Sequence, residues 1–282
     1  MGNHMDLTVK AAAAGAISAA ALALSAPAAT AAIPGNPMSA PTCANQQVVF
    51  VPGGANTIPS APSDVPHGLI TGQMGVKLGL QPDTNATFVG YQAFPFAVSK
   101  YSDSSNEGYN RTAAKIQQIQ NDCPNSKISL VGYSEGADIS ARIINDAAHG
   151  RGPLDKDRFA SAALYANPYQ GGNGAAQYHD DMSNATGALG HLDGGYGELG
   201  ADVLEVCNPQ DIICNYPQEY LGLVSPSMEV DAVHGKLPLQ QIVGEAAQHG
   251  PMDNINLLRG QLAHLQYGGA EFQAGIDWIN NH

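Results

Sequence analysis

The amino-acid sequence predicts an α/β fold, in which helices cover both faces of a mainly parallel β-sheet and form a three-layer sandwich. Two observations lead to this prediction. Short β-rich runs recur along the chain, each followed by a turn signal. Stretches with apolar residues at helical spacing lie between several of these runs. The 282 residues, of which 44% are hydrophobic, are enough for one domain with a sizeable core.

The expected strands and helices alternate, as the crossover connections of a parallel sheet require. Strands are expected at Gln47–Val51, Thr87–Tyr91, Lys127–Gly132, Ser161–Tyr165 and Asp202–Val206. Helices are expected at Glu107–Asn121 and Ala137–Ala148. We therefore expect one folded domain that covers residues 43–282.

Two segments interrupt this alternation. Gly171–Gly200 is rich in Gly, Ala and Asn, which predicts a long loop, and loops of this length often carry function. Residues 215–261 mix apolar residues with Pro and Gly and contain an expected helix at Leu237–Gln248. We expect these residues to form an insertion, which is either a lid over a pocket or a peripheral helical segment packed on the sheet.

Residues 1–31 have the pattern of a secretory signal peptide. Lys10 precedes an apolar, Ala-rich run from Ala11 to Leu24, and an Ala-Thr-Ala cleavage pattern ends at Ala31. The run is short for a membrane span, and no later stretch approaches about 20 apolar residues. We expect a secreted protein without a transmembrane segment, extracellular or in the cell envelope, with residues 32–42 as an extended spacer.

The charge balance bears on the partners. Twelve Lys and Arg residues stand against 25 Asp and Glu, a formal net charge of -13. Such a charge repels nucleic acid and anionic lipid headgroups, so a neutral or apolar substrate fits better. The same acidity is also a common means of keeping a protein soluble.

Four cysteines, Cys43, Cys123, Cys207 and Cys214, can pair completely in an oxidising compartment. The sequence allows three pairings. Cys207 and Cys214 are close enough along the chain to close a small loop, and this pairing leaves Cys43 with Cys123 as a long-range bridge.

The strongest local motif is Lys127-Ile-Ser-Leu-Val-Gly-Tyr-Ser134-Glu-Gly-Ala, a G-x-S-x-G directly after an apolar strand and directly before a helix. This placement is typical of the nucleophile elbow of α/β-hydrolases, a strained turn that exposes the Ser side chain. Residues 132 and 136 are glycines, and we expect neighbouring backbone to pass too close to them for a larger side chain. The backbone amide of Glu135, at the start of the helix, can donate to a developing oxyanion.

A serine nucleophile needs a histidine base, and the base needs a carboxylate that fixes its tautomer. In this fold the order along the chain is Ser, acid, His. Composition does not choose among the downstream histidines, which are His149, His179, His191, His234, His249, His264 and His282.

Three blocks of the sequence resemble the signature blocks of the cutinase family, and they occur in the family's order. They are the elbow block from Cys123 to Ala137, Cys207-Asn-Pro-Gln-Asp211-Ile-Ile-Cys214, and Ala263-His264-Leu-Gln-Tyr267-Gly268. In that family the short disulfide loop carries the triad acid, which corresponds to Asp211, and the last block carries the base, which corresponds to His264. The bridge would pre-position the acid.

The resemblance also bears on the substrate. The segment from Gly187 to Gly200 is similar to larger cutinase-like esterases of mycolic-acid-containing actinobacteria and their phages, which cleave mycolate esters such as trehalose dimycolate. The phage lysins among them have no signal peptide of their own. The signal peptide expected here therefore favours a host envelope or secreted esterase that acts on an ester lipid or glycolipid.

Three departures from the family pattern matter. Glu135 stands where Gln is usual, and a carboxylate there could shift the pH optimum. The turn after the first strand lacks the usual hydroxyl residue, so the second oxyanion amide is expected from Gly54 or Ala55. The separation of Asp211 from His264 is long for a compact cutinase, which keeps His234 as an alternative base.

The sequence thus predicts a serine carboxylic ester hydrolase. Ser134 attacks the ester carbonyl, His264 takes its proton, and Asp211 orients the imidazole, with no metal or cofactor required. Two alternatives remain, an acyltransferase that passes a mycolyl group to a sugar, and a non-catalytic envelope-binding protein on the same fold. The oligomeric state is not readable from the sequence.

Overall fold

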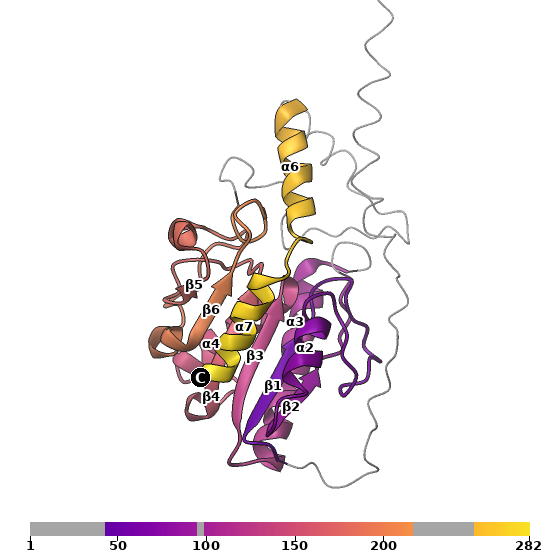
Figure 1. Cartoon of the computed structure of the whole chain (residues 1–282), viewed down its shortest axis with the longest axis vertical. Helices are drawn as coiled ribbons and strands as arrows, with labels where there is room; N and C mark the ends of the chain where they lie inside the picture. Colours follow the sequence, from indigo (N-terminus) through magenta and orange to yellow (C-terminus); the bar gives the residue numbers. More distant parts are fainter. Residues whose placement is uncertain (1–42, 95–98, 217–250) are drawn as a thin grey trace, which may run out of the picture.

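The computed structural model describes residues 43–94, 99–216 and 251–282. The predicted signal peptide (1–31), the spacer (32–42), the expected helix Leu237–Gln248 and most of the predicted insertion lie outside these residues. The described part is an α/β sandwich with a parallel sheet as its middle layer (Figure 1). The predicted fold class is confirmed.

In the described part of the chain, a six-stranded sheet has the order β2-β1-β3-β4-β6-β5, with every neighbouring pair parallel. The strands are β1 (Gln46–Val51), β2 (Thr84–Phe88), β3 (Lys127–Tyr133), β4 (Phe159–Tyr165), β5 (Ala176–Gln177) and β6 (Val203–Val206). Each of the five expected strands overlaps an observed one, but of Thr87–Tyr91 only Thr87 and Phe88 belong to β2. β5, which pairs with β6, lies inside the segment Gly171–Gly200 that was expected to be a loop.

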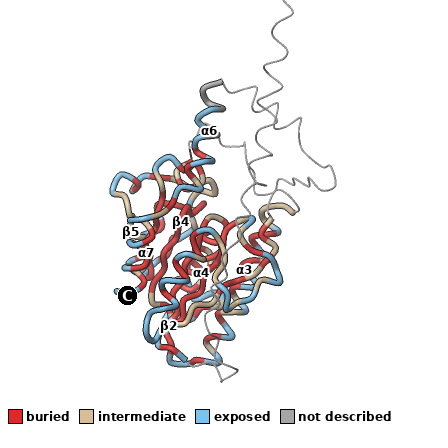
Figure 2. Tube along the Cα trace, turned by 45° about the vertical axis from the view of Figure 1, so that its right-hand side comes forward, coloured by how far each residue is buried: buried red, intermediate tan, exposed pale blue. Residues whose placement is uncertain are grey.

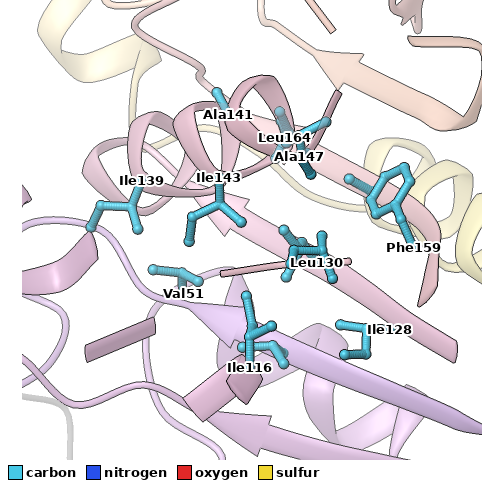
Figure 3. Packing of buried hydrophobic residues seen from close by; sticks show 14 of the residues in the cluster. Val51, Ile116, Ile128, Leu130, Ile139, Ala141, Ile143, Ala147, Phe159 and Leu164 are labelled. Atoms are coloured by element: carbon cyan, nitrogen blue, oxygen red, sulfur yellow. The ribbon is translucent and has the colours of Figure 1, made fainter. Parts of the chain in front are cut away.

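The helices are α2 (Thr71–Leu78), α3 (Tyr101–Asp122), α4 (Glu135–Ala148), α6 (Pro251–Ala263) and α7 (Ala270–Asn281). Two hydrophobic clusters hold helices α2, α3, α4 and α7 against the two faces of the sheet, whereas α6 lies beyond it (Figure 1). Because side chains alternate along a strand, Val49 and Val51 of β1 face α3 and α4, whereas Val48 and Phe50 face α2 and α7. Figure 3 shows the first cluster, in which Val51 and Leu130 lie below Ile143 of α4.

Burial follows the same layers. Figure 2 shows buried residues concentrated in the strands and on the inner sides of the helices that cover them. Apolar runs of this kind, buried on both faces, are what a parallel sheet requires. None of the described helices is long and apolar enough to cross a membrane.

Helices α2 and α7 were not expected. Each contains a glycine at the point where it packs against a side chain of the sheet. A Cβ at Gly75 of α2 would lie 2.1 Å from the ring of Phe88, and one at Gly275 of α7 would lie 2.1 Å from the hydroxyl of Tyr165. Glycine lowers helix propensity by about 1 kcal/mol, but here it permits close packing. Tertiary contact therefore overrides the local preference.

A buried carboxylate holds much of Gly171–Gly200 against the sheet. Glu205 of β6 accepts hydrogen bonds from the side chains of Asn167, Tyr196 and Gln177 at 2.8–3.0 Å, and from the backbone N–H of Gly171 at 3.1 Å. A charge so deeply buried is tolerated when several donors satisfy it. The segment is thus an ordered part of the domain and not a simple connecting loop.

The structure contains two disulfides, Cys43–Cys123 and Cys207–Cys214. The first bridge spans 80 residues and ties the start of the domain to the end of α3. The second joins Cys207 to Cys214, with a separation of 7 residues, directly after β6. Of the three pairings that the sequence allowed, the structure therefore has the one with the short loop.

Candidate active site

Ser134 lies in the turn between β3 and α4 with φ 55° and ψ -121°. A positive φ at a residue other than glycine costs about 1–3 kcal/mol and persists only where surrounding contacts enforce it. The turn has the strand-to-helix geometry that the G-x-S-x-G motif predicts. The Ser134 side chain is half-buried, so a substrate can reach it.

Backbone packs tightly around this turn, as the glycines of the motif predicted. A Cβ at Gly132 would lie 2.6 Å from the carbonyl oxygen of Gly136. A Cβ at Gly136 would lie 1.9 Å from the carbonyl oxygen of Val51. Gly53, after β1, passes so close that a Cβ there would lie 3.1 Å from the Cβ of Ser134. These contacts fix the strained turn from three sides.

The structure brings Ser134, His264 and Asp211 together. The Oγ of Ser134 lies 2.8 Å from Nε2 of His264, and Nδ1 of His264 lies 2.8 Å from Oδ2 of Asp211. An ionised carboxylate only accepts, so Nδ1 carries the hydrogen and Nε2 is left to accept from the serine hydroxyl. Asp211 is fully buried, whereas the His264 side chain is 14% exposed. This is the arrangement of a nucleophile, a base and an orienting acid.

His264 follows the last residue of α6, and two contacts place it. Gly260 of α6 packs against the disulfide loop, where a Cβ would lie 2.2 Å from Cγ2 of Ile212. The hydroxyl of Tyr133 donates to the backbone carbonyl of His264 at 2.7 Å, and the two rings stack with centroids 5.2 Å apart. The imidazole is thus held against both the loop of Asp211 and the end of β3.

Hydrogen bonds from both sides hold the Asp211 carboxylate in the loop between Cys207 and Cys214. Its Oδ1 accepts from the backbone N–H of Ile213 at 2.8 Å. Its Oδ2 accepts from the hydroxyl of Tyr267 at 2.7 Å as well as from His264. Each carboxylate oxygen therefore has a donor other than the imidazole, and rotation of the side chain would break one of these bonds.

Tyr267 is a site residue to which sequence analysis gave no role. Its hydroxyl accepts from the backbone N–H of Asn208 at 3.1 Å while it donates to Asp211. Burial, with the charge of Asp211 as the next cause, raises the pKa of Tyr267 well above its ordinary value, so the phenol stays a donor. The His-x-x-Tyr spacing was the signal that could have found it.

The candidate oxyanion amides differ in their availability. Glu135 supplies the first backbone N–H of α4, which has no acceptor within the helix. The N–H of Ala55 donates to the carbonyl of Ala93 and is thereby occupied. Of the two amides that the sequence offered after β1, the one of Gly54 is therefore the better placed to serve a ligand.

The remaining histidines have other surroundings where the structure describes them. Nδ1 of His149 lies 2.7 Å from the carbonyl of Asn145, and Nδ1 of His191 lies 2.8 Å from the carbonyl of Gly171. His234, the alternative base, lies outside the described residues. Within the described residues, no group of three His, Cys, Asp or Glu side chains is arranged to hold a metal ion.

The two disulfides are expected to differ in what they do. The 80-residue bridge constrains the unfolded chain more, so replacing Cys43 and Cys123 with Ser should cost about 4.5 kcal/mol of unfolding free energy. Replacing Cys207 and Cys214 should cost about 2.5 kcal/mol but lower kcat more, because the loop holds Asp211. Denaturant unfolding and ester hydrolysis of both double variants check this. Equal losses of kcat would contradict it.

The comparisons with known proteins agree with this geometry. A family model described as cutinase matches residues 66–223, a range that contains Ser134 and Asp211 and ends before His264. The carboxylesterase Culp6 homolog of Corynebacterium glutamicum is 24% identical over 215 residues, 64% of this chain and 68% of that protein. The probable carboxylesterase Culp3 of Mycobacterium tuberculosis is 28% identical over 149 residues, 51% of this chain and 47% of that protein.

Among solved structures, lysin B from mycobacteriophage D29 is similar in fold. It aligns with a TM-score of 0.55 at 15% identity, over 84% of this chain and 99% of that chain. The alignment thus covers nearly all of lysin B, whereas the chain spans about two thirds of the Culp6 homolog and about half of Culp3.

Proposed function

This chain belongs to the cutinase family, and we propose that it is a secreted serine esterase that cleaves carboxylic esters of lipids. The observation that carries the proposal is the chain of two 2.8 Å contacts from Ser134 through His264 to Asp211 at a strained elbow. In relatives named as carboxylesterases, ester cleavage is the activity that the name states.

Catalysis proceeds in two steps. His264 takes the hydroxyl proton of Ser134 while the serine oxygen attacks the ester carbonyl, and Asp211 stabilises the imidazolium that forms. The backbone N–H groups of Glu135 and Gly54 donate to the oxyanion. His264 then gives the proton to the leaving alcohol. In the second step a water molecule, deprotonated by His264, attacks the acyl carbonyl, the bond to the serine oxygen breaks, and His264 returns the proton to Ser134 as the acid leaves.

Apolar surface beside the triad supports a lipid substrate. Leu262 and Leu265, which flank His264 in sequence, are each 48% exposed. A hollow of about 430 Å³ lies between the disulfide loop and α6, with a mixed lining in which Ile212 and Leu262 lie among polar residues such as Asn215, Asn256 and Arg259. An acyl chain that covers the two exposed leucines loses contact with water, which favours binding in proportion to the apolar area covered.

Export and the lipid class rest on further observations. Two disulfides with no free cysteine among the described residues suit an oxidising compartment, in agreement with the predicted signal peptide. Relatives in Corynebacterium and Mycobacterium, together with the resemblance of residues 187–200, favour mycolate-type esters such as trehalose dimycolate. A long-chain glycolipid ester is therefore the substrate that we propose.

Covalent labelling and a substrate series test the proposal. A p-nitrophenyl phosphonate should add one phosphonyl group to the wild type, on Ser134, and none to Ser134→Ala. Hydrolysis of p-nitrophenyl esters from short to long chains, and of trehalose dimycolate, should favour the long chains. Labelling of Ser134→Ala would overturn the assigned nucleophile. Labelling without cleavage of any ester would overturn the esterase, and a short-chain optimum would overturn the lipid substrate.

A further inference from the structure

Glu135, the residue after the candidate nucleophile, has an unusual environment for a carboxyl group. Its side chain is 1% exposed, and neither of its two carboxyl oxygens has a hydrogen-bond partner among the described residues. Burying a charge without partners is costly, and a carboxylate with no donors would be one of the least stable groups in the domain. The proposed mechanism uses only the backbone amide of this residue.

Two hydroxyl groups lie beside this carboxyl, and each is engaged by a backbone carbonyl. The hydroxyl of Ser104 on α3 donates to the carbonyl of Gln92 at 2.6 Å, and that of Tyr91 donates to the carbonyl of Pro52 at 2.7 Å. A hydroxyl carries one hydrogen, so each has at most a shared hydrogen left for Glu135. Such surroundings fit a carboxylic acid, which brings its own hydrogen, better than a carboxylate.

The charged groups around Glu135 lead to the same conclusion. Asp138, one turn later on α4, carries a negative charge that is already matched by Arg142 at 2.7 Å and by the hydroxyls of Tyr101 and Ser105. Arg142 is thus engaged with a different carboxylate. Tyr91, after β2, and Tyr101 of α3 have pKa values raised well above the ordinary value by burial, so both remain neutral in the range considered.

We propose that Glu135 is held as a neutral carboxylic acid while the enzyme works, and that its ionisation sets the alkaline limit of catalysis. This inference rests on the proposed function. The backbone N–H of Glu135 faces the oxyanion that forms during attack by Ser134. A negative charge on the side chain of the same residue, in a site shielded from water, opposes that oxyanion. Glu135 thus acts on the reaction through the charge state of its side chain and does not contact the substrate with its carboxyl group.

The direction of the pH effect follows from burial. Desolvation raises the pKa of Glu135 to about 8, and the charge of Asp138 acts in the same direction, although the hydroxyls of Ser104 and Tyr91 and the charge of Arg142 oppose it. In the unfolded chain the same carboxyl loses its proton near its ordinary pKa, about 4.3. Between these two values the folded protein holds one proton more than the unfolded chain. Stability therefore falls as pH rises through this window, and the loss is complete above the folded pKa.

The experiment compares wild type with Glu135→Gln, which keeps the shape of the side chain and cannot ionise. Glu198→Gln is the control, because it removes the same charge from an exposed side chain that pairs with Lys156. For each protein, kcat/KM at pH 9.5 is divided by kcat/KM at pH 7. We expect this ratio to be about tenfold lower in wild type and Glu198→Gln than in Glu135→Gln. Equal ratios in all three proteins would overturn the proposed alkaline limit.

Two further measurements do not depend on esterase activity. Thermal unfolding from pH 4 to pH 9 should show Glu135→Gln gaining stability relative to wild type as pH rises, whereas Glu198→Gln should not. In wild type with ¹³C-labelled glutamate carboxyl groups, NMR should show one glutamate titrating near pH 8. If no glutamate titrates above pH 6, the neutral acid is excluded. If it titrates near pH 8 while Ser134 takes no phosphonate label, the proposed function fails and the neutral acid stands.

Discussion

Replacing His264 with alanine is expected to lower kcat for ester hydrolysis by about 10⁴-fold or more. Nε2 of this histidine lies 2.8 Å from the hydroxyl of Ser134, and a serine hydroxyl without a base is a weak nucleophile at neutral pH. The oxyanion amides remain in place in the variant, so some hydrolysis above the rate in water should persist. Steady-state assays with a p-nitrophenyl ester measure the decrease in kcat.

His234→Ala is the matched control for this variant. It removes the same type of side chain from the predicted insertion 215–261, and it should leave kcat within about twofold of wild type, because the proposed mechanism gives His234 no step. The reverse pattern, with His234→Ala inactive and His264→Ala active, would place the base in the insertion. The His264–Asp211 contact would then serve structure alone.

Asp211→Asn should lower kcat by about 10³- to 10⁴-fold. All the neighbours of this carboxyl are donors, namely the imidazole Nδ1 of His264, the hydroxyl of Tyr267 and the backbone N–H of Ile213. An asparagine must turn its NH₂ group toward one side. If the NH₂ group faces Ile213, two donors oppose each other and the backbone N–H loses its acceptor. If it faces His264, it donates to Nδ1 and favours the tautomer with the hydrogen on Nε2, which cannot accept from Ser134.

The far-UV circular dichroism spectrum separates this effect from simple misfolding. Asp211→Asn should keep the wild-type spectrum while its kcat stays low. Asp202→Asn, which changes the same residue type outside the triad, is the control. A variant that kept wild-type kcat would show that Asp211 does not orient the base.

Much of the sheet could be predicted because its signals are local. The run Lys127–Gly132 is apolar, ends in a glycine and leads into a helix, so β3 and α4 follow from neighbouring residues alone. Helices α2 and α7 could not be predicted in the same way, since Gly75 and Gly275 weaken their helical pattern. What favours helix there is contact with Phe88 of β2 and Tyr165 of β4, which lie outside the helices' own sequence.

The site shows the same division. Ser134 was predicted from the motif around it, and Asp211 and His264 from family blocks whose spatial meeting no local pattern reveals. The structure places them in contact, and their catalytic roles stay predictions until the variants are measured. The state of the Ala55 amide could not be predicted, because its acceptor, the carbonyl of Ala93, comes from a separate part of the chain.

The meeting of Ser134 with His264 joins residues 130 positions apart, and that of Asp211 with His264 joins residues 53 apart. Contacts so distant along the chain form late in folding, because each must overcome the entropy of closing a long loop. The elbow joins a strand and a helix that are adjacent in sequence, although its strained turn also depends on packing against Val51 and Gly53. We therefore expect His264 to reach the nucleophile late, so that catalytic activity is the last property that a refolding chain regains.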